Sequence, residues 1–230
     1  MYLDYTFKPK LETRPMRLNA LRTLLATAAL LAGGAASAAA VGIFGSYIAI
    51  DADGPGAAGF AWYGGTQPGP TTGPAFHGAD LGDFALGAAA YISGAEVLSW
   101  KNGGGDVTGA VLSWRVNGGA FTSQAIGFTS DLPFNDAMGN VFASTPGDQK
   151  WAQLSGTPID FLAGLGAGEH TLELYWRITS NIGERSDSRG GANYRASFSV
   201  LEPAPVPVSS PASLALAGLG LALLAAARRR

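Results

Sequence analysis

Cysteine is absent from all 230 residues of the chain. This absence excludes thiol catalysis, zinc sites built on cysteine and stabilisation by disulfides. Charged side chains are also scarce, at 14% of the residues, and the formal net charge is −2. A chain with so little positive charge carries no electrostatic footprint for nucleic acid. We therefore expect no nucleic-acid partner, and a fold held together by packing alone.

Recognisable catalytic motifs are missing as well. The sequence contains no G-x-S-x-G nucleophile elbow, no H-E-x-x-H zinc motif and no P-loop. The two histidines, His77 and His170, are paired with no such motif, and structural or exposed roles suit them better. The few acidic residues lie mostly in turns, so spacing assigns no carboxylate pair for glycoside hydrolysis. We predict that the protein is not an enzyme.

Glycine and proline, by contrast, are frequent, with 33 and 13 residues, and they favour many turns over long helices. Between residues 41 and 201 the hydrophobic period is two, which is typical of strands. Strands are predicted at 95–100, 108–116, 121–128, 170–180 and 194–201. The pattern predicts an all-β fold, an antiparallel β-sandwich.

Turn residues refine this prediction. The run Asn117-Gly118-Gly119 suits a tight turn with positive φ and should join two strands as a hairpin. Residues 51–80 are broken by repeated Gly and Pro, which predicts a loop or meander. Residues 159–165 are interpreted as a short helical turn.

The N-terminus has the pattern of a signal peptide. From Met16, two arginines form a positive segment, residues 24–31 are apolar, and Ala36 and Ala38 fit the A-x-A rule for cleavage. We predict export, with cleavage by signal peptidase after Ala38; a buried Ala/Leu helix is the weaker alternative. Residues 1–15 fit no part of a signal, which leaves open a start at Met16 or a long positive segment.

The C-terminus combines a proline-rich spacer, an apolar stretch and three arginines, Arg228, Arg229 and Arg230. The apolar stretch has roughly 16 residues, about 24 Å as a helix. A hydrocarbon core is about 30 Å thick, so local thinning and snorkelling arginines would supply the difference. We predict a C-terminal transmembrane helix whose arginines stay on the cytoplasmic side, with the body of the protein outside.

This tail resembles the PEP-CTERM sorting signal, which exosortase-type enzymes of Gram-negative bacteria recognise. Pro211, Ala212 and Ser213 match its start, whereas Ser209 and Ser210 replace two residues of its Pro-Glu-Pro tripeptide. The resemblance covers only the end of the chain. It implies a sorting enzyme as partner and a protein anchored in the membrane, released to the cell surface or matrix, or both. An ordinary C-terminal anchor, with the same topology and no processing, is the alternative.

The middle of the chain resembles a module of secreted bacterial proteins, on the sequence blocks at 100–109, 148–151 and 190–194. That resemblance implies an immunoglobulin-like sandwich and supplies no activity. A jelly-roll-like sandwich is the other form we consider. The predicted organisation is a 1–40 N-terminal extension and signal peptide, a 41–201 β-sandwich domain, a 202–211 spacer and a 212–230 sorting helix.

Aromatic residues are the candidates for ligand binding. Trp62, Trp100 and Trp151 fall at predicted loops or strand ends, where an exposed ring could stack on a sugar. Packing under a loop is the preferred role for each of them, and sugar binding is the alternative. Trp114 and Trp176 fall within predicted strands among apolar neighbours, and we expect them in the core.

One segment suggests a metal. Asp51 and Asp53 begin like a calcium loop, but the oxygen ligand at its fifth position and the glutamate at its twelfth are missing, so it is not an EF-hand. A Ca²⁺ site at the edge of a sandwich is kept as a hypothesis, and no other cofactor is expected. Asp106 and Asp148 are similar candidates, for which turn formation is the preferred role.

Three functions follow, in order of preference. The first is an exported structural or interaction protein of the cell envelope or extracellular matrix, in the class that the tail associates with exopolysaccharide-producing bacteria. The second is a carbohydrate-binding module that recognises exopolysaccharide through loop aromatics. The third, a hydrolase, lacks any recognisable nucleophile, base or metal set.

Overall fold

The structure is a computed structural model that describes residues 38–52, 59–154 and 158–204. The chain divides into two units, Met1–Ala38 and Ala39–Arg230, and every described strand belongs to the second unit. The predicted sorting residues Pro211, Ala212, Ser213 and Arg228–Arg230 lie outside the described residues, as do Ala36 and Asp53.

The described part of the chain is all-β, as the hydrophobic pattern predicts. Its strands are β1 (Ala40–Asp51), β2 (Ala61–Gly64), β3 (Asp80–Ala85), β4 (Tyr91–Asn102), β5 (Val107–Val116), β6 (Thr122–Asp131), β7 (Phe134–Asn135), β8 (Val141–Phe142), β9 (Asp148–Leu154), β10 (Ile159–Asp160), β11 (Gly168–Ser180), β12 (Gly183–Asp187) and β13 (Tyr194–Leu201). A 3-10 turn, η1 (Arg189–Gly191), precedes β13. Within the described ranges, no helix has the length and hydrophobicity needed to cross a membrane.

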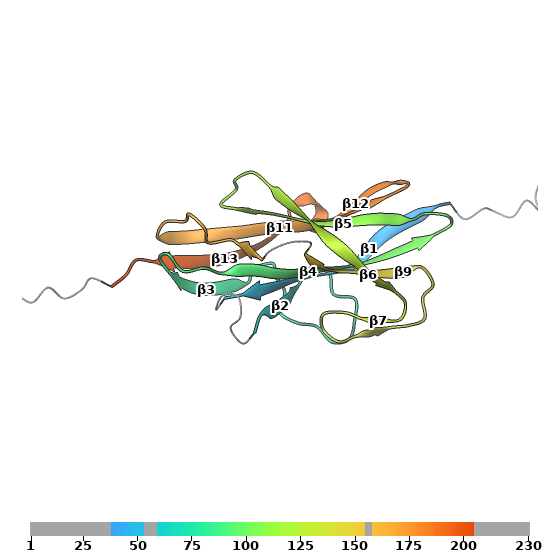
Figure 1. Ribbon diagram of the computed structural model, residues 1–230, viewed down its shortest axis with the longest axis horizontal. Helices are drawn as coiled ribbons and strands as arrows, with labels where there is room; N and C mark the ends of the chain where they lie inside the picture. Colours follow the sequence, from blue (N-terminus) through green and yellow to red (C-terminus); the bar gives the residue numbers. More distant parts are fainter. Residues whose placement is uncertain (1–37, 53–58, 155–157, 205–230) are drawn as a thin grey trace, which may run out of the picture. The chain divides into compact units, whose positions relative to one another are not determined.

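Eleven of these strands form one sheet, in the order β2-β1-β4-β9-β6-β5-β11-β13-β3, with β10 added to β4 and β12 added to β11. The sheet curls, so that β1 contacts β11 and β12, and β4 contacts β5. Figure 1 shows the resulting layers, with β5, β11 and β12 on one side and β2, β3 and β4 on the other. This arrangement is consistent with a β-sandwich. β7 and β8 form a separate two-stranded ribbon.

The strand pairs described are antiparallel except that of β13 with β3. The sequence pattern predicts a wholly antiparallel sandwich, and this edge differs from it. Parallel neighbours need a long crossover between them. β3 and β13 meet this condition because they are far apart in the sequence. The sequence pattern missed the pairing because turn residues indicate only contacts between neighbouring segments.

The predicted alternation is clearest in β11, which lies between β5 and β13. Leu172, Leu174, Trp176 and Ile178 have no exposed surface and lie in the main core between the layers. The predicted hairpin is also confirmed, because β5 pairs with β6. Asn117 and Gly118 join the two strands with φ angles of 53° and 70°, which suit the right-handed twist of the strands.

Two local predictions need correction. The 51–80 region is largely irregular, but it contains β2, which pairs with β1. Its loop is held by the side-chain amide of Gln67, whose Oε1 accepts a bond from the Gly73 N–H at 2.8 Å. The helical turn predicted at 159–165 is wrong: the segment begins with β10, which pairs with β4, and continues as a turn.

A second hydrophobic cluster lies apart from the main core. It is centred on Tyr47, Leu98 and Phe134, each at most 7% exposed. Residues 132–142, which carry the β7–β8 ribbon, contribute several members of this cluster. We call residues 132–142 the cap, because they cover part of the sheet face formed by β1 and β4.

Replacement of Leu174 by alanine is expected to lower the free energy of unfolding by about 2–5 kcal/mol, because it leaves a cavity in a well-packed core. Val141 is 70% exposed, so Val141→Ala is a matched control with an expected change of about 0.5 kcal/mol or less. Urea unfolding followed by circular dichroism measures both. Equal losses in the two variants would contradict the placement of Leu174 in the core.

Candidate functional site

One face of β4 and β9 points away from the main core. On β4 it carries Gly94, Glu96, Leu98 and Trp100, because side chains alternate along a strand. Their partners on β9 are Ala152, Lys150 and Asp148, opposite Glu96, Leu98 and Trp100 respectively. The residues between them, including Ala95, Val97 and Trp151, belong to the main core. We call the side with Glu96 and Lys150 the outer face.

A charged pair is built into this outer face. Glu96 is 1% exposed, and its Oε2 lies 2.8 Å from Lys150 Nζ. Its Oε1 accepts a hydrogen bond from the backbone N–H of Ala137 in the cap at 2.9 Å. Lys150 Nζ also donates to the carbonyl of Asn135 at 2.6 Å. Burial raises the pKa of the Glu96 carboxyl, although Lys150 and the Ala137 N–H act in the opposite direction. The pair therefore ties the cap to the sheet.

A second network fixes the conformation of the cap itself. Asp136, 5% exposed, accepts a hydrogen bond from the Tyr47 hydroxyl at 2.7 Å. It also accepts from the backbone N–H groups of Met138 and Asn140 and from the Asn140 side-chain amide. Burial raises the pKa of the Tyr47 hydroxyl, which keeps it a proton donor. The cap is thus anchored by hydrogen bonds as well as by apolar packing.

Beside the cap, the outer face is open and holds a cavity of about 280 Å³. Trp62 of β2 forms one wall. Its ring lies over small residues of the sheet, since a Cβ added to Gly94 would be 3.4 Å from both the Trp62 ring and the Ala49 side chain. Phe60, 53% exposed, stands at 90° to Trp62 with ring centroids 5.7 Å apart. Glu96, Lys150 and Gln153 line the same cavity.

Gln153 has an unusual backbone. Its φ is 74°, a left-handed conformation that is uncommon for residues other than glycine. The register of β9 against β6 shifts between Trp151 and Leu154, the stretch that contains Gln153. A bulge of this kind changes the direction of a side chain and is frequent beside functional sites. Here it brings the exposed Gln153 to the cavity.

The predicted tryptophans have three different surroundings. Trp62 lines the cavity just described. Trp100, half-buried at the other end of the same face, lines a separate cavity of about 330 Å³ with Lys101 and Asp148. Burial raises the pKa of the Asp148 carboxyl there.

Trp151 is packed, as the preferred interpretation expects, but it does not lie at a loop or strand end. It lies in the middle of β9 and is 6% exposed. Its Nε1–H donates to the Ser99 hydroxyl at 3.0 Å. The reason is that β9 continues past this residue to Leu154, with the Trp151 side chain directed to the main core. Trp151 therefore packs under the sheet and does not belong to the open cavity.

The proposed calcium ligands are placed in part. Asp51 ends β1 and is 6% exposed, whereas Asp53 is not described. Among the described residues, no three His, Asp or Glu side chains gather so as to hold a metal ion. The Ca²⁺ site stays a prediction.

The two histidines lie apart from the cavity beside Trp62. His170 stacks on Phe198 with ring centroids 5.3 Å apart, and His77 accepts a hydrogen bond from the Arg195 N–H at 3.3 Å.

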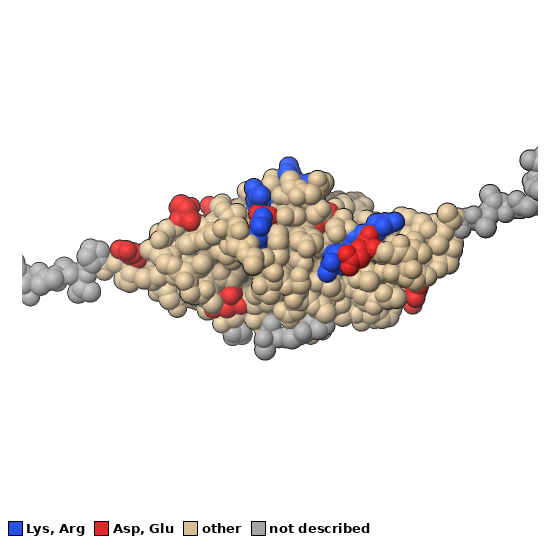
Figure 2. Space-filling view, turned by 90° about the horizontal axis from the view of Figure 1, so that it is seen from above, with Lys and Arg blue, Asp and Glu red and all other residues tan. Residues whose placement is uncertain are grey.

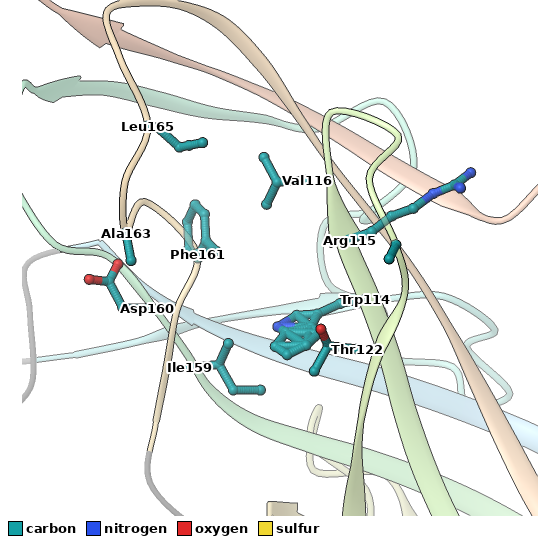
Figure 3. A pocket seen from close by; sticks show the side chains of 10 residues that line it. Trp114, Arg115, Val116, Thr122, Ile159, Asp160, Phe161, Ala163 and Leu165 are labelled. Atoms are coloured by element: carbon teal, nitrogen blue, oxygen red, sulfur yellow. The ribbon is translucent and has the colours of Figure 1, made fainter.

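A further cavity, of about 180 Å³, lies between the end of β5 and the segment after β10. Figure 3 shows the apolar side chains of Trp114, Val116, Phe161 and Leu165 around it, with Arg115 directed away. Arg115 instead pairs with Glu173 at 2.7 Å. The lining is mostly apolar, and of its polar members Asp160 already accepts a hydrogen bond from the Leu162 N–H at 3.0 Å.

The β5–β11 side carries its charges in mixed groups. Glu173, 4% exposed, binds Arg115, Arg195 and the Asn193 amide. Burial acts to raise the pKa of Glu173, but these hydrogen bonds and charges outweigh it and lower the pKa. Figure 2 shows few charged side chains on the face in view, with basic and acidic groups side by side near its centre and right and separate acidic groups elsewhere. That face presents no patch of a single sign.

No protein-family model matches the chain, and a search of curated proteins gives no match. The function is therefore argued from its own residues. Of the predicted binding residues, Trp62 alone belongs to the cavity beside the cap. Sequence reasoning missed its other lining residues, among them Phe60, Glu96, Lys150 and Gln153. One signal was present, since Glu96 is a lone acid within an apolar strand.

Replacement of Lys150 by methionine is expected to lower the free energy of unfolding at pH 7 by about 3–5 kcal/mol, because it leaves the Glu96 carboxylate buried without its partner. Burial raises the pKa of Glu96 even with Lys150 present, and the variant loses a positive charge that lowers this pKa, so the pKa of folded Glu96 rises further above its unfolded value. Stability of the variant therefore falls as the pH rises above 4.5, the ordinary pKa of the group, and the loss shrinks as the pH falls to that value.

Urea unfolding at a series of pH values measures this dependence. The control is Lys101→Met, since the Lys101–Asp106 pair is more exposed, at 31% and 56%, and its removal should change stability by about 1 kcal/mol or less. A loss in Lys150→Met that is independent of pH would show that Glu96 is not the group responsible.

Proposed function

We propose that the protein is an exported, non-enzymatic component of the cell envelope or extracellular matrix of a Gram-negative bacterium. In this proposal a signal peptide directs export of the β-domain across the inner membrane. An exosortase-type enzyme then recognises the PEP-CTERM-like tail and sorts the protein to the cell surface or matrix. The observation that carries the proposal is the extent of the fold: the described strands run from Ala40 to Leu201, between the two predicted processing regions.

The start of the domain supports signal cleavage after Ala38. Ala38 and Ala39 are exposed and precede the first strand. β1 then pairs with β4 from Ala40 onward, beginning opposite Asn102. A peptidase that cuts after Ala38 would therefore leave the whole of β1 in the mature protein.

The end of the domain supports processing of the tail in the same way. β13 closes with Leu201, and its Tyr194, Ala196, Phe198 and Val200 side chains are buried. Residues 202–204, the first of the proline-rich spacer, are exposed. An exosortase-type enzyme acting beyond this point would leave every described strand in the mature protein.

The finer class of the domain is part of the proposal. We infer an immunoglobulin-like sandwich, with a jelly-roll-like sandwich as the alternative, from the curled sheet and its central strands β5, β11 and β13. A domain that packs this way needs no disulfide, in keeping with a chain that contains no cysteine.

Intact-mass spectrometry of the protein, expressed in a Gram-negative host that contains an exosortase-type enzyme, tests the proposal. We expect a mature N-terminus at Ala39 and loss of the arginine-terminated helix. Ala38→Asp should retain the signal, because signal peptidase requires a small residue at that position. Replacing Arg228, Arg229 and Arg230 by serine should reduce tail processing while leaving signal cleavage unchanged.

The two cleavages are read separately. A mature protein that begins at Ala39 but keeps its tail would support export with an ordinary anchor and reject sorting. A protein that keeps residues 16–38 in the cytoplasm, with the tail intact, would overturn the proposal as a whole.

A further inference from the structure

We infer that the cavity beside Trp62 binds the ring of a neutral saccharide. The inference rests on the proposed function and deepens it, since it names what an envelope or matrix protein would hold. It is argued from three properties of the cavity: its aromatic walls, its polar floor and its charge balance.

The aromatic walls come from Phe60 and Trp62. Trp62 is half-buried and supported by Gly94 and Ala49, so its ring is held in place. Phe60 is 53% exposed and perpendicular to it. The C–H faces of a sugar ring are apolar and pack against aromatic faces, and a rigid ring loses little entropy when it does so. A volume of about 280 Å³ lies just below the usual range of about 300–1,000 Å³ for small-molecule sites, which suits a single ring.

The polar groups of the cavity suit hydroxyls. The Lys150 ammonium can donate hydrogen bonds, and the exposed Gln153 amide can both donate and accept them. Glu96, at 1% exposure, is already bonded to Lys150 and to the Ala137 N–H, and it fixes the position of the ammonium. A sugar hydroxyl both donates and accepts, so one ring can bond to both Lys150 and Gln153. Lys150 has three N–H donors, of which the contacts to Glu96 and Asn135 use two.

The charge balance indicates a neutral ligand. Glu96 and Lys150 neutralise each other at 2.8 Å, so the cavity presents no net charge to a ligand. A uronate would be attracted by Lys150 but repelled by the Glu96 carboxylate beside it, and would separate a pair that also anchors the cap. A hydroxylated ring without charge avoids both penalties.

The test is binding of the purified full-length chain to an array of neutral oligosaccharides (glucans, mannans and galactans) printed beside uronic-acid polymers. We expect binding to at least one neutral class. Phe60→Ala should weaken it about tenfold, equivalent to about 1.4 kcal/mol, through the loss of one aromatic wall. Trp62→Ala should abolish it.

The matched control is Phe128→Ala. Phe128 is 51% exposed and stands edge-on to Trp151, with ring centroids 5.2 Å apart. It therefore matches Phe60 in residue type, exposure and ring pairing, but it does not line the cavity beside Trp62. Its replacement should leave binding unchanged. Thermal melting checks that every variant folds, and Gln153→Ala, a change at an exposed side chain, gives a second cavity variant with an expected loss of binding.

Several results would overturn the inference. They are no binding to any neutral glycan, binding to uronic-acid polymers alone, and neutral binding that Phe60→Ala and Gln153→Ala leave unchanged. None of these results affects the mass-spectrometric test of export, because that test reads the two ends of the chain. Failure of the saccharide site and failure of the proposed function are therefore distinguishable.

Discussion

The ion pair between Glu96 and Lys150 connects the parts of the structure that matter for function. It crosses from β4 to β9, it binds the cap through the Ala137 N–H and the Asn135 carbonyl, and it lines the cavity beside Trp62. A carboxylate at 1% exposure is unfavourable unless it is paired and hydrogen-bonded. The cavity and the cap therefore depend on the same ion pair, and loss of Lys150 would disturb both.

The cap explains how a sheet with two apolar faces stays ordered without disulfides. Tyr47 and Leu98 face outward from β1 and β4, yet neither has exposed surface. The cap covers them, while Asp136 binds the Tyr47 hydroxyl beneath it. What the cap leaves open is a strip of small and polar residues bordered by Trp62. The binding site we infer is thus the uncovered remainder of a face that is otherwise packed.

Much of the fold follows from periodicity, and much of the site does not. Alternation predicts β11 and β13, and the Asn117-Gly118 turn predicts the β5–β6 hairpin, because these signals are local. The parallel contact of β13 with β3 and the pairing of β10 with β4 depend on segments far apart in the sequence. Lys150 meets Glu96 although the two residues are 54 positions apart in the sequence. No local pattern reports such a contact, although a lone acid in an apolar strand indicates that a partner exists.

Trp62 and Trp151 show why residue type alone does not identify a binding site. Each stands at the edge of a phenylalanine that is about half exposed, Phe60 or Phe128. Side chains alternate along β9, and Trp151 is on the side that faces the main core, where its Nε1–H donates a hydrogen bond to the Ser99 hydroxyl. Trp62 instead meets an open space with a charged pair and an amide on its border. An aromatic pair becomes a candidate for recognition when its polar neighbours face a cavity, and strand register decides whether they do.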